Sequence, residues 1–170
     1  MVIKAIKDRK SIRNYVPKAN VSEEQIKELL EAAMLAPSAC NSRPWTFIVV
    51  QNREKLEAIT KIHPHTQMLT TASCAIVVCA DLNLQSGISE GFFPQDCGAT
   101  TQNILLQATE LGLGTCWCGI YPKGAMVGAF RSLFELPDNV VPFCVIAVGV
   151  PDEEMGSRGF YEEGKVKWIK

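Results

Sequence analysis

The sequence predicts a layered α/β arrangement in which helices cover both faces of a central β-sheet. Four short, almost wholly apolar runs rich in β-branched residues are typical of strands buried on both faces. The segments between them repeat apolar residues at helical spacing. A chain of 170 residues can form one domain with a substantial core, so we treat residues 1–170 as a single unit. This pattern does not give the order of the strands.

The segment at residues 23–36 carries the clearest helix signals. Ser22 and Gln25 form a capping box, and Val21 precedes them as an apolar residue that can pack on the first turns. Apolar residues then follow at intervals of three and four, and Pro37 stops the helix. We expect further helices at residues 2–8, 53–62, 95–111 and 123–134.

The four apolar runs predict strands at residues 46–51, 74–81, 115–121 and 143–150. Residues 82–93 show neither helical nor strand periodicity, so we expect a loop there. Gly87, Gly91 and the pair Phe92-Phe93 indicate a mobile flap over a site.

The charge balance argues against several classes of partner. The chain has 17 Lys and Arg against 18 Asp and Glu, so electrostatics gives no reason to expect nucleic acid or an anionic membrane. The apolar runs are too short to span a bilayer. Charges interrupt the first ten residues, unlike a signal peptide. We therefore expect a cytoplasmic protein.

Seven cysteines raise the question of disulfides or metals. Their count is odd and their spacing lacks the paired C-x-x-C of a zinc site, so we expect neither a disulfide framework nor a bound metal. Cys74, Cys79 and Cys144 lie in strand-like runs and are expected to pack as small buried hydrophobic residues.

The first candidate site is Arg9-Lys10-Ser11-Ile12-Arg13. Arg9 and Arg13 are four residues apart, so on a helical turn they would point the same way. Two guanidinium groups and the Ser11 hydroxyl would then hold a phosphate dianion through charge-assisted hydrogen bonds. The alternative is a solvated basic end of a short helix.

The second candidate site is the loop at residues 36–45, which Pro37 and Pro44 bracket between a helix and a strand. Its rigid backbone presents four polar side chains, those of Ser38, Asn41, Ser42 and Arg43. The alternative is an ordinary helix-to-strand connection made of turn-forming residues.

The third candidate site is the segment at residues 112–119, where Gly112 and Gly114 precede a strand. Glycines let a planar ligand approach backbone amides closely. A helix precedes this segment and a strand follows it, the reverse of the order in a dinucleotide-binding G-x-G-x-x-G. Alternation along the strand places Cys116 and Cys118 on the face opposite to Trp117. We favour packing for these cysteines over a redox role.

Together these motifs resemble those of the nitroreductase family of FMN enzymes over nearly the whole chain. The family's R-R-S-x-R opening, A-P-S-S-x-N-x-Q-P-W loop and G-L-G-T-x-W strand correspond to residues 9–13, 36–45 and 112–117. Gln102-Asn103 and Gly149-Val150-Pro151 match two further motifs in the same order. The resemblance implies an α+β, nitroreductase-like fold: a central, mostly antiparallel sheet of four to five strands flanked by helices, in an intertwined homodimer.

The resemblance also implies which residues bind FMN. Its phosphate and ribityl end would contact Arg9, Lys10, Ser11 and Arg13. Its pyrimidine side would contact Pro37, Ser38 and Asn41, which come from the other subunit in this family. Its ring would lie along Thr115, Cys116, Trp117 and Gly119, and Arg158 is a further candidate for the phosphate.

Two positions depart from the family pattern. Ala39 stands where a second serine is usual, which removes one hydroxyl from the flavin loop. Arg43 stands where glutamine is usual. Near the pyrimidine edge, its fixed charge would favour the anionic reduced flavin and raise the midpoint potential.

The implied activity is that of an FMN-dependent oxidoreductase. NAD(P)H would reduce the flavin and leave, and a small organic acceptor such as a nitroaromatic or a quinone would then take the electrons in a ping-pong cycle. Because the flavin carries this chemistry, we assign no catalytic side chain and give no role to His63 or His65. The alternatives are a specialised family reaction such as dehalogenation or enone reduction, a non-enzymatic FMN-binding or thiol/flavin redox-sensing module, and a flavin-free protein.

The C-terminal stretch at residues 161–170 is polar but contains Val166, Trp168 and Ile169. Such residues have little purpose on a free tail. We therefore expect the tail to wrap around the partner subunit of the implied homodimer.

Overall fold

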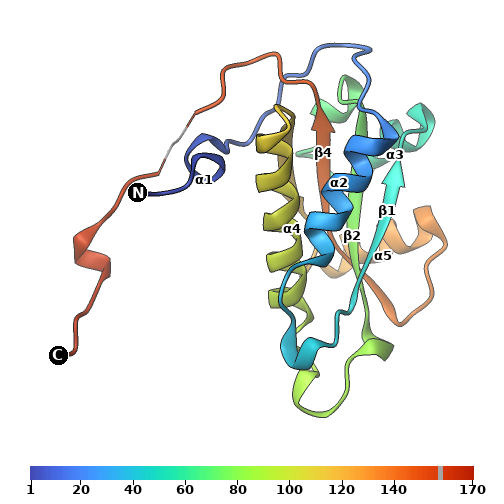
Figure 1. The fold of residues 1–170 in the computed structure, drawn as a ribbon. Helices are drawn as coiled ribbons and strands as arrows, with labels where there is room; N and C mark the ends of the chain where they lie inside the picture. The colour runs from blue at the N-terminus through green and yellow to red at the C-terminus, as the bar shows by residue number, and fades with distance from the viewer. Residues whose placement is uncertain (157–158) are drawn as a thin grey trace.

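The computed structural model describes residues 1–156 and 159–170, and its main elements alternate between helices and strands. The helices are α1 (Lys4–Asp8), α2 (Glu23–Met34), α3 (Arg53–Ile62), α4 (Phe93–Glu110) and α5 (Gly124–Phe134). The strands are β1 (Trp45–Val50), β2 (Cys74–Asp81), β3 (Gly114–Gly119) and β4 (Val140–Gly149). The strands form one sheet in the order β1-β2-β4-β3, and every neighbouring pair is antiparallel (Figure 1). This confirms the predicted antiparallel sheet.

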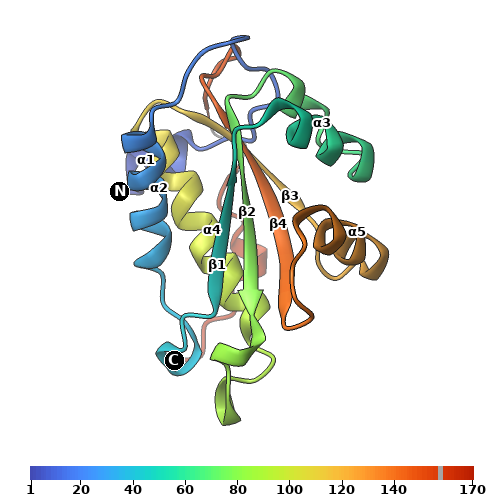
Figure 2. The ribbon, with the colours of Figure 1, turned by 90° about the vertical axis from the view of Figure 1, so that its right-hand side faces the viewer.

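Helices cover both faces of this sheet, as predicted. Helices α2 and α4 lie on one face, while α3 and α5 lie on the other (Figure 2). Strand β2 shows the division clearly, because Ile76 packs with the α2 and α4 side chains and the next residue, Val77, packs with those of α3 and α5. Since β2 and β4 are both interior, β3 is left as an edge strand.

Helix α2 has the predicted start and an earlier end. The capping box is complete, because the Ser22 hydroxyl accepts from the Gln25 backbone N–H and the Gln25 side chain accepts from that of Ser22. The helix ends at Met34 instead of residue 36. Pro37 disfavours the helical region for the residue before it, so the last turn closes earlier than the apolar pattern indicated.

The predicted strand at residues 143–150 is longer in the structure because its N-terminal part pairs with the end of β2. Pro142 lies opposite Cys79, where the register between β2 and β4 shifts by one residue. An irregularity of this kind accommodates a proline within a sheet. Strand β3 in turn ends at Gly119, two residues before the predicted end.

Residues 82–93 form no long helix or strand up to the start of α4, as predicted. Two short 3-10 turns occupy Leu82–Leu84 and Gly87–Ser89. The buried Gln85 side chain donates to the Ser89 carbonyl at 2.7 Å, which ties the segment together from within. The flap stays a prediction.

The cysteines of the central strands pack in the core, as predicted. Cys74, Cys79 and Cys144 are fully buried, and burial raises the pKa of each thiol to about 12. None of the helices in the described part of the chain has both the length and the apolar character that crossing a bilayer requires.

Candidate functional site

The segment at residues 9–13 is extended and runs beside β3, which corrects the prediction of a helical turn. Helix α1 ends at Asp8, and Arg9 already has a ψ of 124°. Ser11 then forms a parallel bridge with Thr115, and the Ile12 N–H donates to the Thr115 carbonyl at 2.8 Å. Pairing with the edge of the sheet therefore overrides the local helical tendency.

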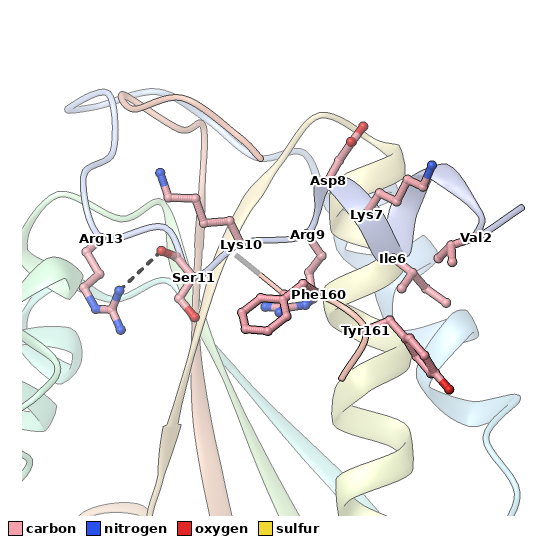
Figure 3. A pocket seen from close by; sticks show the side chains of 11 residues that line it. Val2, Ile6, Lys7, Asp8, Arg9, Lys10, Ser11, Arg13, Phe160 and Tyr161 are labelled. Atoms are coloured by element: carbon pink, nitrogen blue, oxygen red, sulfur yellow. Dashed lines mark hydrogen bonds between the residues drawn. The ribbon is translucent and has the colours of Figure 1, made fainter. Parts of the chain in front are cut away.

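The extended conformation still brings the basic side chains together, by a different periodicity. Alternate residues of an extended chain point the same way, so Arg9, Ser11 and Arg13 share one side (Figure 3). Arg13 Nη1 also donates to the Ser11 carbonyl at 3.4 Å. Two guanidinium groups and one hydroxyl on one side form the arrangement that suits a phosphate.

Gly114 explains why the first and third motifs can meet. A Cβ at this position would lie 2.8 Å from Ile12 Cγ2 and 3.0 Å from Ile12 Cβ. Ile12 is completely buried, so it has no room to give way. The absence of a side chain at Gly114 therefore lets the basic segment lie directly against β3.

Lys10 points to the opposite side of the segment (Figure 3). Its Nζ donates to the Glu154 carbonyl at 2.8 Å and lies 3.4 Å from Glu153 Oε2. Glu153 Oε1 also accepts from the backbone N–H groups of Arg13 and Asn14, at 2.5 and 3.1 Å. The bond from the Arg13 N–H is the main reason why the pKa of Glu153 lies below its usual value. Lys10 thus fastens the segment to the chain that follows β4.

A cavity of about 920 Å³ opens on the basic side of this segment. Arg9, Ser11 and Arg13 line one side of it, and Phe160 and Tyr161 from the C-terminal tail line another (Figure 3). Its volume lies within the range of small-molecule and cofactor sites.

The outer edge of β3 continues the site beyond the basic segment. The Thr115 carbonyl accepts a hydrogen bond from the Ile12 N–H, so the backbone groups of Thr115 point away from β4. The direction alternates along a strand, so those of Trp117 and Gly119 point outward as well. Within the described ranges, no backbone hydrogen bond joins the outward groups of Trp117 to another segment. The middle of this edge is therefore open to a ligand.

The side chains of β3 alternate as predicted. Trp117 is 37% exposed and packs against Phe143, with ring centroids 6.0 Å apart. Cys116 and Cys118 lie on the other face and are buried. The neighbouring Cys118 lowers the pKa of Cys116 to about 7, and Cys116 in turn raises the pKa of Cys118.

His63 contributes to the site although the sequence analysis gave it no role. It follows the last residue of α3, and its Nε2 lies 2.9 Å from the Gly119 carbonyl oxygen. The Cys118 thiol donates to the His65 carbonyl at 3.2 Å. The C-terminal end of β3 is thus held by the segment that follows α3. Only the burial of His63, at 3% exposed, distinguishes it, and burial is not visible in the sequence.

The second motif lies apart from the first within one chain. The basic segment precedes α2 and the loop at residues 36–44 follows it, at the opposite end of the helix in both views (Figures 1 and 2). Pro37, Ser38 and Asn41 are therefore not brought together with Arg9 and Arg13.

The backbone of this loop is strained at three positions. Cys40, Asn41 and Arg43 have φ of 51°, 53° and 48°, a region that non-glycine residues adopt at some cost. The Ser38 hydroxyl is used within the loop, where it accepts from the Arg43 N–H at 2.9 Å. Arg43 Nη2 donates to the Met34 carbonyl at 3.2 Å, so its charge caps the end of α2.

Asp96 in the first turn of α4 supports the loop and was also missed from sequence. Its Oδ1 accepts from the Ala39 N–H at 2.9 Å. Its Oδ2 is buried and has no hydrogen-bond partner among the described residues. Arg158, the remaining predicted phosphate ligand, lies outside the described residues.

The chain belongs to the Nitroreductase family, whose model matches residues 6–66 and 63–150. A Methanothermobacter thermautotrophicus protein named "Putative NADH dehydrogenase/NAD(P)H nitroreductase" is 46% identical over 170 residues, which cover 98% of this chain and 87% of that protein.

Two solved structures share the fold. An FMN-dependent nitroreductase from Clostridium difficile R20291 is 30% identical, with a TM-score of 0.89 over 99% of both chains. A Desulfovibrio desulfuricans structure described as "a putative nitroreductase in complex with fmn" is 27% identical, with a TM-score of 0.81 over 98% of this chain and 95% of that one.

Proposed function

We propose that this protein is an FMN-dependent oxidoreductase that takes electrons from NAD(P)H and reduces a small organic acceptor such as a nitroaromatic or a quinone. The observation that carries the proposal is the basic segment fixed beside the open edge of β3. Arg9, Ser11 and Arg13 on one side of this segment suit a phosphate, and the outward backbone groups of Trp117 suit the polar edge of a planar ring. Family membership and the names of the relatives support the same cofactor and donor.

The residues fit FMN with a clear division of tasks. Arg9, Ser11 and Arg13 would bind the phosphate, while Lys10 positions them through Glu153 and Glu154. Because the Cys116 side chain is buried on the core face of β3, its contribution to the ring site would come from the backbone alone.

When bound, FMN would supply the hydride acceptance and onward electron transfer that the reaction needs. The chain would hold the phosphate, orient the ring against β3 and shield one of its faces. The half-exposed Trp117 beside the open edge suits this shielding task.

The absorption spectrum of the purified protein tests the proposal. We expect the two visible bands of an oxidised flavin, which bleach without oxygen when NADH or NADPH is added. Arg9→Ala and Arg13→Ala should each raise the Kd for FMN by about tenfold or more, because a hydrogen bond to a charged group contributes roughly 1.5–3 kcal/mol. Lys61→Ala, which removes an exposed cation at the end of α3, serves as the control. A protein that stays colourless after incubation with FMN would refute the proposal.

We further propose that two copies of the chain complete each site. Within one chain the loop at Pro37–Asn41 lies at the far end of α2 from the basic segment, so a ligand on β3 would meet this loop only from a second copy. The C-terminal tail extends away from its own domain (Figure 1), with Trp168 and Ile169 73% and 89% exposed. These side chains suit burial against a partner.

Removing the end of the tail tests this assembly. A chain ending at Gly164 lacks Val166, Trp168 and Ile169, and we expect it to run as a monomer in sedimentation and to lose most of its bound FMN. The matched control is Lys167→Ala in the full-length chain, which alters the tail without removing apolar area. A truncated chain that remains a dimer with FMN bound would contradict the role of the tail.

A further inference from the structure

The two hydrogen bonds of the His63 ring define which of its nitrogens carries the proton. The His65 backbone N–H lies 3.2 Å from His63 Nδ1 and can only donate, so Nδ1 is the acceptor. The proton of the neutral ring therefore sits on Nε2, which donates to the Gly119 carbonyl at 2.9 Å. One tautomer satisfies both bonds, and the ring is 3% exposed.

The segment that carries His63 is itself firmly held. The His63 N–H donates to the Ile59 carbonyl of α3 at 2.9 Å. The buried Thr66 hydroxyl donates to the His63 carbonyl at 2.7 Å. These bonds fix the base from which the imidazole reaches β3.

Gly119 is held by β4 on its inner side, because the Ile120 N–H of the same peptide unit donates to the Phe143 carbonyl at 3.0 Å. It has no side chain, and a Cβ built on it would have no atom within 4 Å, so side-chain packing of this residue adds no restraint. It is also the last residue of β3. The imidazole bond to the Gly119 carbonyl restrains the same peptide on its outer side.

The outer edge of β3 is thus held at two points with an opening between them. Ile12 holds the Thr115 carbonyl at one end, and His63 holds the Gly119 carbonyl at the other. Trp117 lies between them, and no other described segment forms a backbone hydrogen bond with its outward N–H and carbonyl groups.

We propose that His63 is a positioning residue for the flavin site: through Nε2 it sets the orientation of the Gly119 peptide and so the geometry of the open edge of β3. This inference rests on the proposed function. The imidazole acts through Gly119 and does not itself touch the ligand.

Two amide substitutions separate the two bonds of the imidazole. In His63→Gln the side-chain NH₂ can reach the place of Nε2 and keep the bond to Gly119. In His63→Asn the shorter amide can replace Nδ1 as acceptor for the His65 N–H but leaves the Gly119 carbonyl without its donor. Both variants bury a neutral amide in place of a neutral ring, so they form a matched pair.

We expect His63→Asn to raise the Kd for FMN about tenfold and His63→Gln to stay within about threefold of the unchanged protein. In the FMN-free protein, amide hydrogen exchange at residues 117–121 should be about tenfold faster in His63→Asn, with His63→Gln again close to the unchanged protein. A role in general stability alone would shift both variants together.

Equal effects of the two variants on FMN affinity and exchange, or no effect of either, would overturn this inference while leaving the proposed function intact. An unchanged protein that binds no FMN would instead refute the proposed function, and this inference with it.

Discussion

Gly114→Ala is expected to separate the basic segment from β3 and to abolish most FMN binding. The new Cβ would lie 2.8 Å from Ile12 Cγ2, and Ile12 is completely buried, so the segment must move outward. Overpacking of this kind costs roughly 1–3 kcal/mol. We expect the free energy of unfolding, measured in urea, to fall by about that amount and the Kd for FMN to rise more than tenfold.

Gly119→Ala is the matched control for the stability measurement. It adds the same methyl group to the same strand, where no atom lies within 4 Å. Its free energy of unfolding should change by less than about 0.5 kcal/mol. Adding Ile12→Ala to Gly114→Ala removes two of the three contacting atoms, so the double variant should be more stable than the sum of the single effects predicts. Strictly additive effects would contradict the proposed overlap.

Asp96→Ala is expected to free the loop at residues 36–44, which we propose contacts the flavin. Asp96 Oδ1 holds the Ala39 N–H at 2.9 Å, immediately before two residues with positive φ. Loss of this acceptor leaves a partly buried N–H without a partner, which costs roughly 1–3 kcal/mol. We therefore expect the free energy of unfolding to fall by about that amount and the Kd for FMN to rise about tenfold.

Asp96→Asn separates the hydrogen bond from the charge. The amide oxygen can still accept from the Ala39 N–H, and the variant removes a buried charge whose second oxygen has no partner among the described residues. We expect FMN affinity within about threefold of the unchanged protein and a change in the free energy of unfolding below about 1 kcal/mol. If titration calorimetry shows Asn and Ala weakening FMN equally, the charge and not the loop support is what matters.

Sequence reasoning recovered the elements that depend on neighbours in the chain. The capping box at Ser22 and Gln25 and the alternation around Trp117 are local patterns, and the structure confirms both. The order β1-β2-β4-β3 depends on contacts between distant segments, and no local pattern contains it. The same reason explains the error over Arg9 and Arg13, because the helical spacing is local whereas the pairing of Ser11 with Thr115 is not.

The parts of the site that sequence reasoning missed are supporting groups. His63 and Asp96 act on backbone atoms of Gly119 and Ala39, which are 56 and 57 residues away. A backbone carbonyl that accepts a hydrogen bond, or a backbone N–H that donates one, leaves no trace in the identity of its residue, so the motif residues could be found and these partners could not.

The long-range hydrogen bonds of the N-terminal segment also constrain the order in which the chain can fold. Glu153 binds the Arg13 N–H across 140 positions of the chain, and the buried Tyr15 hydroxyl bonds to the Ala147 carbonyl across 132. On the ribosome, the basic segment is made before its partners: Thr115 of β3 follows about a hundred residues later, and Glu153 later still. Contacts of such long range form late, since loop closure must precede them. A cofactor that needs this segment can therefore bind only after the sheet that contains β3 and β4 has formed, so its binding would follow folding and would not direct it.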